Sequence, residues 1–95
     1  MGTGDEEFWV KDHGLVLAVC DKELLGKKVD GVLINEKFYK GELLGREKLE
    51  EKLNASKNVN MFGKKSTDVA ICLKMAEKEN CLMIGGIPHL QLVFL

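Results

Sequence analysis

Two short segments hold most of the side chains that could do chemistry. The first, Gly63-Lys64-Lys65-Ser66-Thr67, places two ammonium groups and two hydroxyls where a helix is expected to begin. The N–H groups of a first helical turn lack partners within the helix and favour anions, so a phosphate is the expected ligand. The segment is not a P-loop, because position 58 is not glycine and Lys65 separates Gly63-Lys64 from the hydroxyls. Nucleotide hydrolysis is therefore not predicted.

The same segment ends a basic stretch of the chain. Between Lys52 and Thr67 there are four lysines and no acidic residue, although the whole chain has a net charge of −1. Any contact with nucleic acid must therefore come from a local patch. The predicted RNA- or phosphate-binding residues are Lys57, Asn60, Gly63, Lys64, Lys65 and Ser66. The alternative is an ordinary solvated loop that leads into a capped helix.

The second segment is the turn Gly85-Gly86-Ile87-Pro88-His89, followed by Gln91. Its glycines are expected to supply positive φ or close backbone approach. His89 would share a strand face with Gln91. One interpretation is a histidine that only holds the turn by a hydrogen bond. The other is a pocket lined by Gly85, Gly86, Pro88, His89 and Gln91, with His89 as a general base.

The cysteines give no sign of metal or redox chemistry. Cys20, Cys72 and Cys81 are odd in number, have no C-x-x-C spacing and stand among apolar residues. We expect three reduced core thiols, no disulfide, no structural metal and no cofactor. No nucleophile signature surrounds Ser66 or Cys81, so no catalytic residue is predicted and an enzyme is not favoured.

Composition limits the class of protein. Ninety-five residues, 45% of them hydrophobic, with a single proline, predict one folded domain over residues 1–95. The polar start, residues 1–7, is expected to be a disordered tail and does not resemble a signal peptide. No apolar run reaches membrane-spanning length. These features predict a cytoplasmic protein without a membrane partner.

Hydrophobic patterning predicts an α+β fold with a mixed or antiparallel sheet of about five strands and two main helices. Asp21 is expected to cap a short helical turn over 21–28, and Ser66 or Thr67 to cap the second helix. That helix should be the main cover of a sheet centred on segments 15–20 and 89–94, the most apolar strands. The expected strands are 8–11, 15–20, 31–34, 81–84 and 89–94, and the expected helices are 46–55 and 67–79.

Several motifs resemble one family. They are Ala18-Val19-Cys20-Asp21 with Leu24-Leu25-Gly26-Lys27, Phe38-Tyr39 with Gly41-Glu42, Asn60-Met61-Phe62-Gly63, and Ile84-Gly85-Gly86-Ile87-Pro88-His89-Leu90-Gln91. In this order they resemble the archaeal domain-of-unknown-function family 424, small proteins sometimes labelled predicted RNA-binding. The resemblance covers nearly the whole chain from about Phe8 onward. It implies a soluble archaeal cytoplasmic protein, and it does not assign an enzymatic activity.

Three functions therefore stand as hypotheses. The first is an RNA- or ribonucleoprotein-binding module, near translation, with no DNA expected. The second is an enzyme or small-ligand binder at the turn around His89, and the third is an interaction subunit that uses the uncharged C-terminal strand as an edge. The oligomeric state is left open. The deciding observation is whether Gly63 and His89 lie on the same face of the fold.

Overall fold

A mixed sheet of six strands organises residues 7–94, which are the residues that the computed structural model describes. The strands lie in the order β5-β1-β2-β6-β8-β7. Only β2 and β6 pair in parallel, and every other neighbouring pair is antiparallel. The bounds are β1 Phe8–Asp12, β2 Leu17–Asp21, β5 Glu42–Leu44, β6 Asn58–Phe62, β7 Leu82–Ile84 and β8 Ile87–Val93.

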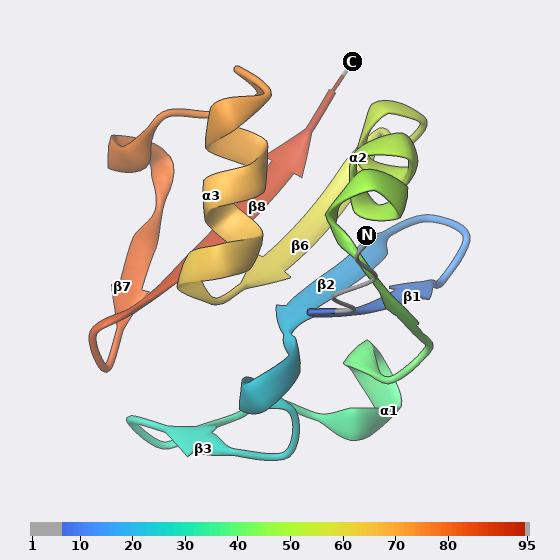
Figure 1. The fold of residues 1–95 in the computed structure, drawn as a ribbon. Coiled ribbons are helices and arrows are strands. Elements are labelled where there is room, and N and C mark those ends of the chain that lie inside the picture. The colour runs from blue at the N-terminus through green and yellow to red at the C-terminus, as the bar shows by residue number, and fades with distance from the viewer. Residues whose placement is uncertain (1–6, 95) are drawn as a thin grey trace.

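Helices cover both faces of this sheet. The two longer helices, α2 (Arg46–Asn54) and α3 (Lys64–Cys72), lie on one face. The short helix α1 (Glu36–Tyr39) and a separate hairpin lie on the other (Figure 1). The hairpin consists of β3 (Lys28–Val29) and β4 (Val32–Leu33). Two 3-10 turns complete the fold, η1 (Lys22–Leu24) and η2 (Lys78–Asn80).

The core consists of two layers because the central strand β2 is buried on both sides. Leu17 and Val19 face α2 and α3, while Ala18 and Cys20 face α1. Alternate residues of a strand point to opposite faces, so an uninterrupted apolar strand is the kind that is covered twice. α3 packs on β2, β6 and β8, as expected for the main covering helix.

The predicted α+β class, the mixed sheet and the two main helices are confirmed. Both strands expected at the centre, β2 and β8, are internal in the sheet, as predicted. The strand that was missed is β6, which was assigned to a loop and lies between them. Asn58 and Asn60 made this segment resemble a loop in the sequence. They occupy one face of β6, while Val59 and Met61 are buried on the other.

The limits of other elements also differ from expectation. α3 begins at Lys64 and ends at Cys72, well before the predicted residue 79, and Lys74 follows with a left-handed φ of 65°. Only Cys20 is a core thiol; Cys72 is exposed and Cys81 is half-buried, so the assignment of all three to the core was wrong. None of the helices in the described part of the chain is both long and apolar enough to cross a membrane.

Glu7, the last residue of the predicted disordered tail, is part of the folded structure. Glu7 donates its N–H to the carbonyl of Leu44 and accepts a bond from the N–H of Lys22. Glu7 is therefore tied to the sheet, and the remainder of the predicted tail, residues 1–6, lies outside the described residues.

Candidate functional site

The start of α3 is held by a carboxylate from the end of β2. Asp21 is 4% exposed, and its Oδ2 accepts the N–H of Lys65 at 3.0 Å. Its Oδ1 accepts the N–H of Ser66 at 2.7 Å and the Ser66 hydroxyl at 2.6 Å. Burial raises the pKa of the Asp21 carboxyl above its ordinary value, and the hydrogen bonds from Ser66 and Lys65 oppose that rise. Asp21 therefore supplies, at the N-terminus of α3, the negative charge that a bound anion would otherwise supply.

This arrangement corrects three expectations. The N–H groups of Lys65 and Ser66 are not free for phosphate, because Asp21 already binds them. Asp21 makes no side-chain cap to the turn that follows it. The N-cap of α3 is Gly63, and the Thr67 hydroxyl donates back to the Gly63 carbonyl at 2.9 Å.

The lysines of the predicted basic segment are dispersed or paired with carboxylates. Lys64 contacts Asp68 at 3.0 Å. Lys65 lies 3.8 Å from Glu7 and 3.7 Å from Glu23. Lys57 precedes β6 whereas Gly63 follows it, which places them roughly 20 Å apart at the rise of an extended strand. The structure thus separates Lys57 from Lys64 and Lys65.

Asn60, His89 and Gln91 lie together on the sheet face that carries α1. Asn60 is opposite Gln91, and Phe62 is opposite His89, in the antiparallel pairing of β6 with β8. The rings of Phe62 and His89 meet edge to face, 5.1 Å between centroids. Leu90, between His89 and Gln91, is buried on the α3 side. The backbones of Gly63 and Pro88 are hydrogen-bonded at 2.9 Å, yet the side chain of His89 lies on the face opposite to α3.

Contacts of aromatic rings continue from this face to α1. The Tyr39 hydroxyl donates to Asn60 Oδ1 at 2.7 Å. Tyr39 meets Phe38 edge to face, and Phe38 stacks on His13 with 4.8 Å between centroids. Burial raises the pKa of the Tyr39 hydroxyl, so it serves as a neutral donor. A continuous row therefore runs from the turn after β1 to the amide of Asn60.

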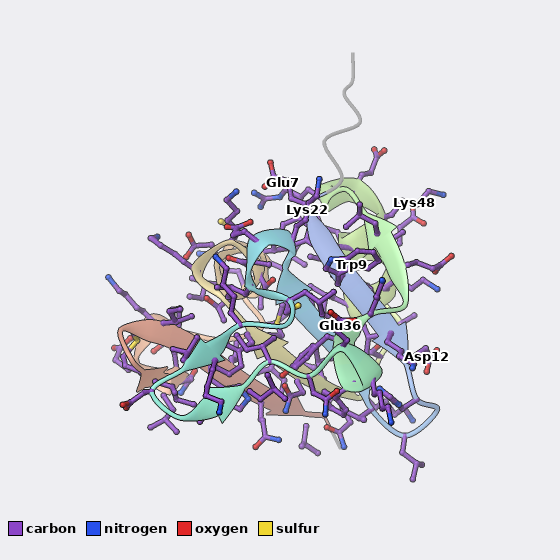
Figure 2. The ribbon with its side chains drawn as sticks, turned by 90° about the horizontal axis from the view of Figure 1, so that it is seen from below. Glu7, Trp9, Asp12, Lys22, Glu36 and Lys48 are labelled. Carbon is purple, nitrogen blue, oxygen red and sulfur yellow. The ribbon has the colours of Figure 1, made fainter. Side chains whose placement is uncertain are left out.

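Lysines alternate with these rings. Lys40 lies over the ring of Trp9, 5.8 Å from its centroid, and Lys11 donates to the carbonyl of Lys37 at 2.8 Å. We call this surface the aromatic–lysine corner; Figure 2 views the molecule from this side and labels Trp9. Among residues 7–94, none of its three lysines forms an ion pair with a carboxylate. Its members are Trp9, Lys11, His13, Lys37, Phe38 and Lys40.

The buried thiol beneath α1 is not a candidate nucleophile. Cys20 is completely buried. Burial raises its pKa to about 12, and the neighbouring Asp21 and Glu23 act in the same direction. The thiolate is the reactive form, and at neutral pH this cysteine stays protonated.

A cavity of about 390 Å³ lies between α3 and the β7–β8 hairpin. One wall is α3, through Thr67, Asp68 and Ile71, and the hairpin supplies Met83 and Pro88. Of the predicted pocket residues, Gly86 and Pro88 line this cavity, whereas Gly85, His89 and Gln91 do not. The general base expected in the pocket is therefore not part of its lining. The full lining is Asp21, Leu24, Lys64, Thr67, Asp68, Ile71, Lys78, Cys81, Met83, Gly86, Ile87 and Pro88.

A family model described as "Protein of unknown function (DUF424)" matches residues 8–95 of the chain. The chain belongs to the DUF424 family. It is also similar to the crystal structure of an uncharacterized conserved protein from Methanopyrus kandleri. The TM-score is 0.76 at 24% sequence identity, over 93% of this chain and 90% of the other, which establishes a shared fold. No curated protein matches the chain.

His89 of this DUF424 protein is expected to make stability depend on pH. Burial lowers the pKa of His89 below its ordinary value of 6.5, so the unfolded chain takes up the proton first as pH falls. The His89 contribution to the free energy of unfolding is thus present above pH 6.5 and is lost as pH falls through the folded-state pKa. Urea unfolding at pH 7.5, 6.5 and about 5.5 should show a flatter profile for His89→Gln than for the parent. Parallel profiles would contradict this.

The aromatic–lysine corner was not predicted, although its alternation of aromatic residues and lysines is visible in the sequence. Phe38 and Tyr39 stand between Lys37 and Lys40 in the sequence. Trp9 and Lys11 are two residues apart in a predicted strand, so their side chains lie on the same face. Aromatic residues interleaved with lysines are typical of nucleic-acid surfaces. That the two segments meet is a tertiary fact, because 25 residues separate His13 from Phe38.

Proposed function

We propose that the protein binds single-stranded RNA across the sheet face that carries α1. The observation that carries the proposal is the aromatic–lysine corner, where half-exposed rings alternate with lysines that have no carboxylate partner among the described residues. Rings of this kind offer stacking surfaces to unpaired bases, and ammonium groups contact phosphates. The partner would be RNA of the archaeal cytoplasm, free or within a ribonucleoprotein that serves translation.

The polar side chains next to the corner support the same function. The exposed amide of Gln91 lies opposite Asn60, whose carbonyl oxygen is held by Tyr39. The Asn60 NH₂ group remains a donor toward a base or sugar. Phosphate contacts would then position the strand, and Asn60, His89 and Gln91 would supply the contacts that distinguish bases.

The neighbouring charges favour Lys37 and Lys40 over Lys64 and Lys65 as phosphate contacts. Each of Lys64 and Lys65 already has a carboxylate within 4.0 Å. A phosphate would have to compete with those ion pairs. Lys37 and Lys40 are exposed and free of such competition within residues 7–94, so they are the better phosphate contacts.

The test is a salt titration with a fluorescein-labelled, unstructured RNA dodecamer. Each phosphate contact to single-stranded nucleic acid contributes roughly 0.7 to the slope of log K against log salt. The double variant Lys37→Ala/Lys40→Ala should therefore lower the slope by about 1.4. Phe38→Ala should weaken binding about tenfold through lost stacking while keeping the parent slope.

The matched control is Lys64→Ala/Lys65→Ala, which removes the same charge at the start of α3. We expect it to keep the parent slope to within about 0.3. A slope that changes in the control and not in Lys37→Ala/Lys40→Ala would move the interface to α3. Binding that does not depend on salt in the parent would refute the proposal.

A further inference from the structure

β7 is an unprotected edge of the six-stranded sheet. Within the described part of the chain no strand pairs with its outer side (Figure 1). Leu82 is 65% exposed and Met83 58%, and β7 contains no charged residue. The opposite edge strand, β5, contains Glu42, which contacts Lys52 at 4.0 Å. Charged edge residues oppose the addition of further strands, so the two edges differ in their capacity to accept one.

The hydrogen bonds of β8 show which N–H and C=O groups of β7 point out of the sheet. The N–H of Gly63 donates to the Pro88 carbonyl, so Pro88 turns its carbonyl to β6. The N–H and C=O of one strand residue point to the same side, and successive residues alternate. Ile87 and His89 therefore face β7, where they are opposite Ile84 and Leu82. Met83, opposite Pro88, directs its own N–H and C=O away from the sheet.

The α3 cavity lies beside this open backbone. Met83 belongs to both, because its side chain lines the cavity while its peptide groups face outward. The neighbouring lining is largely apolar and includes Ile71, Ile87 and Pro88. Lys78 of η2 also lines it, and within residues 7–94 its ammonium forms no ion pair with a carboxylate.

We propose that β7 and the cavity together form a peptide-binding site for an extended segment of a partner protein. The segment adds as a strand to β7 through the N–H and C=O of Met83. It turns an apolar side chain toward the cavity and an acidic one toward Lys78. Main-chain bonds of this kind supply affinity, and pockets for alternate side chains supply specificity. The lysine favours such a partner over a second copy of β7, which contains no acidic residue.

The site is independent of the RNA surface. The cavity lies beside β7 at one edge of the sheet, whereas β1, which carries Trp9 and Lys11 of the aromatic–lysine corner, lies near the opposite edge with β2, β6 and β8 between them. A strand added at β7 leaves Trp9 and Phe38 untouched, so both partners can bind at once.

The probe is an array of fluorescein-labelled, N-acetylated hexapeptide amides. Each alternates threonine with one apolar residue (Val, Leu, Ile or Phe) and carries either Glu or Lys at one end. Binding is measured by fluorescence anisotropy at fixed ionic strength. We expect the members with Glu to bind about fivefold more tightly than their Lys counterparts, and Lys78→Glu to reverse that order.

The backbone contact is tested by Met83→Pro, with Met83→Ala as its matched control. Proline removes the outward N–H and leaves the β7–β8 hydrogen bonds intact, because Met83 does not take part in them. Met83→Pro should bind the peptide at least tenfold more weakly than Met83→Ala does, at equal thermal stability. Methylation of a backbone N–H in the middle of the hexapeptide should weaken its binding to the parent protein to a similar degree.

Three results would overturn the proposal. One is the absence of any array member that binds below about 1 mM. Another is equal affinity of Met83→Pro and Met83→Ala for the same peptide. The third is sedimentation showing that the parent chain dimerises and that Met83→Pro is monomeric, which would assign β7 to a second copy of this chain.

Discussion

Replacing Gly63 by alanine should strongly destabilise the protein. The added Cβ would overlap the carboxyl group of Asp21. The alanine would also have to adopt the φ of 120° that Gly63 has. That conformation alone costs about 1–3 kcal/mol for a residue with a side chain. Displacing the Asp21 cap adds about 0.5–2 kcal/mol. We expect a total loss of about 3–4 kcal/mol in the free energy of unfolding, measured by urea denaturation.

Gly14→Ala is the matched control for this substitution. Gly14 also has a positive φ, 86°, but an added Cβ would meet nothing within 4 Å. Only the conformational cost applies, about 1 kcal/mol. The double variant Asp21→Ala/Gly63→Ala should cost less than the sum of its parts, because the two groups no longer collide. Equal losses for Gly63→Ala and Gly14→Ala would show that the contact with Asp21 is not energetically important.

The second large effect is expected at Asp21. Asp21→Ala removes the acceptor of three hydrogen bonds and leaves the N–H groups of Lys65 and Ser66, and the buried Ser66 hydroxyl, without their partner. An unsatisfied buried donor costs about 1–3 kcal/mol. Since water can reach the exposed Lys65, we expect a total of about 3 kcal/mol, or roughly 15 °C in Tm for a domain of this size. Thermal melting followed by circular dichroism measures it.

Two further variants separate the charge from the hydrogen bonds. Asp21→Asn keeps one acceptor oxygen and should lose about 1–2 kcal/mol. Ser66→Ala removes one bond of the three and should lose about 1 kcal/mol. If Asp21→Ala proved no worse than Ser66→Ala, the carboxylate would not be the anchor of α3.

The capped start of α3 also argues against the basic segment as a phosphate site. Asp21 supplies the negative charge that the helix N-terminus favours. Lys64 and Lys65 are compensated by Asp68, Glu7 and Glu23. We therefore place RNA binding elsewhere, on the α1 face.

Local patterns in the sequence determined the class of fold. The continuous apolar run of β2 predicts a strand covered on both faces, and Leu49 and Leu53 in α2 predict a surface helix with a narrow buried stripe. The two glycines of the β7–β8 turn predict positive φ, and they have φ of 55° and 79°. These features depend on neighbours in the chain, so the sequence alone suffices for them.

Tertiary structure decided the features that depend on distant residues. β6 is a central strand only because β2 and β8 pair with it, and the Asn60 amide on that strand accepts a bond from Tyr39. Asp21 caps α3 across 45 positions of sequence, a contact that no local propensity specifies. Likewise, His13 and Phe38 stack because the sheet brings the turn after β1 to α1. The sequence by itself determined the elements and their apolar faces; the sheet order, set by long-range strand pairing, determined which side chains could form a site.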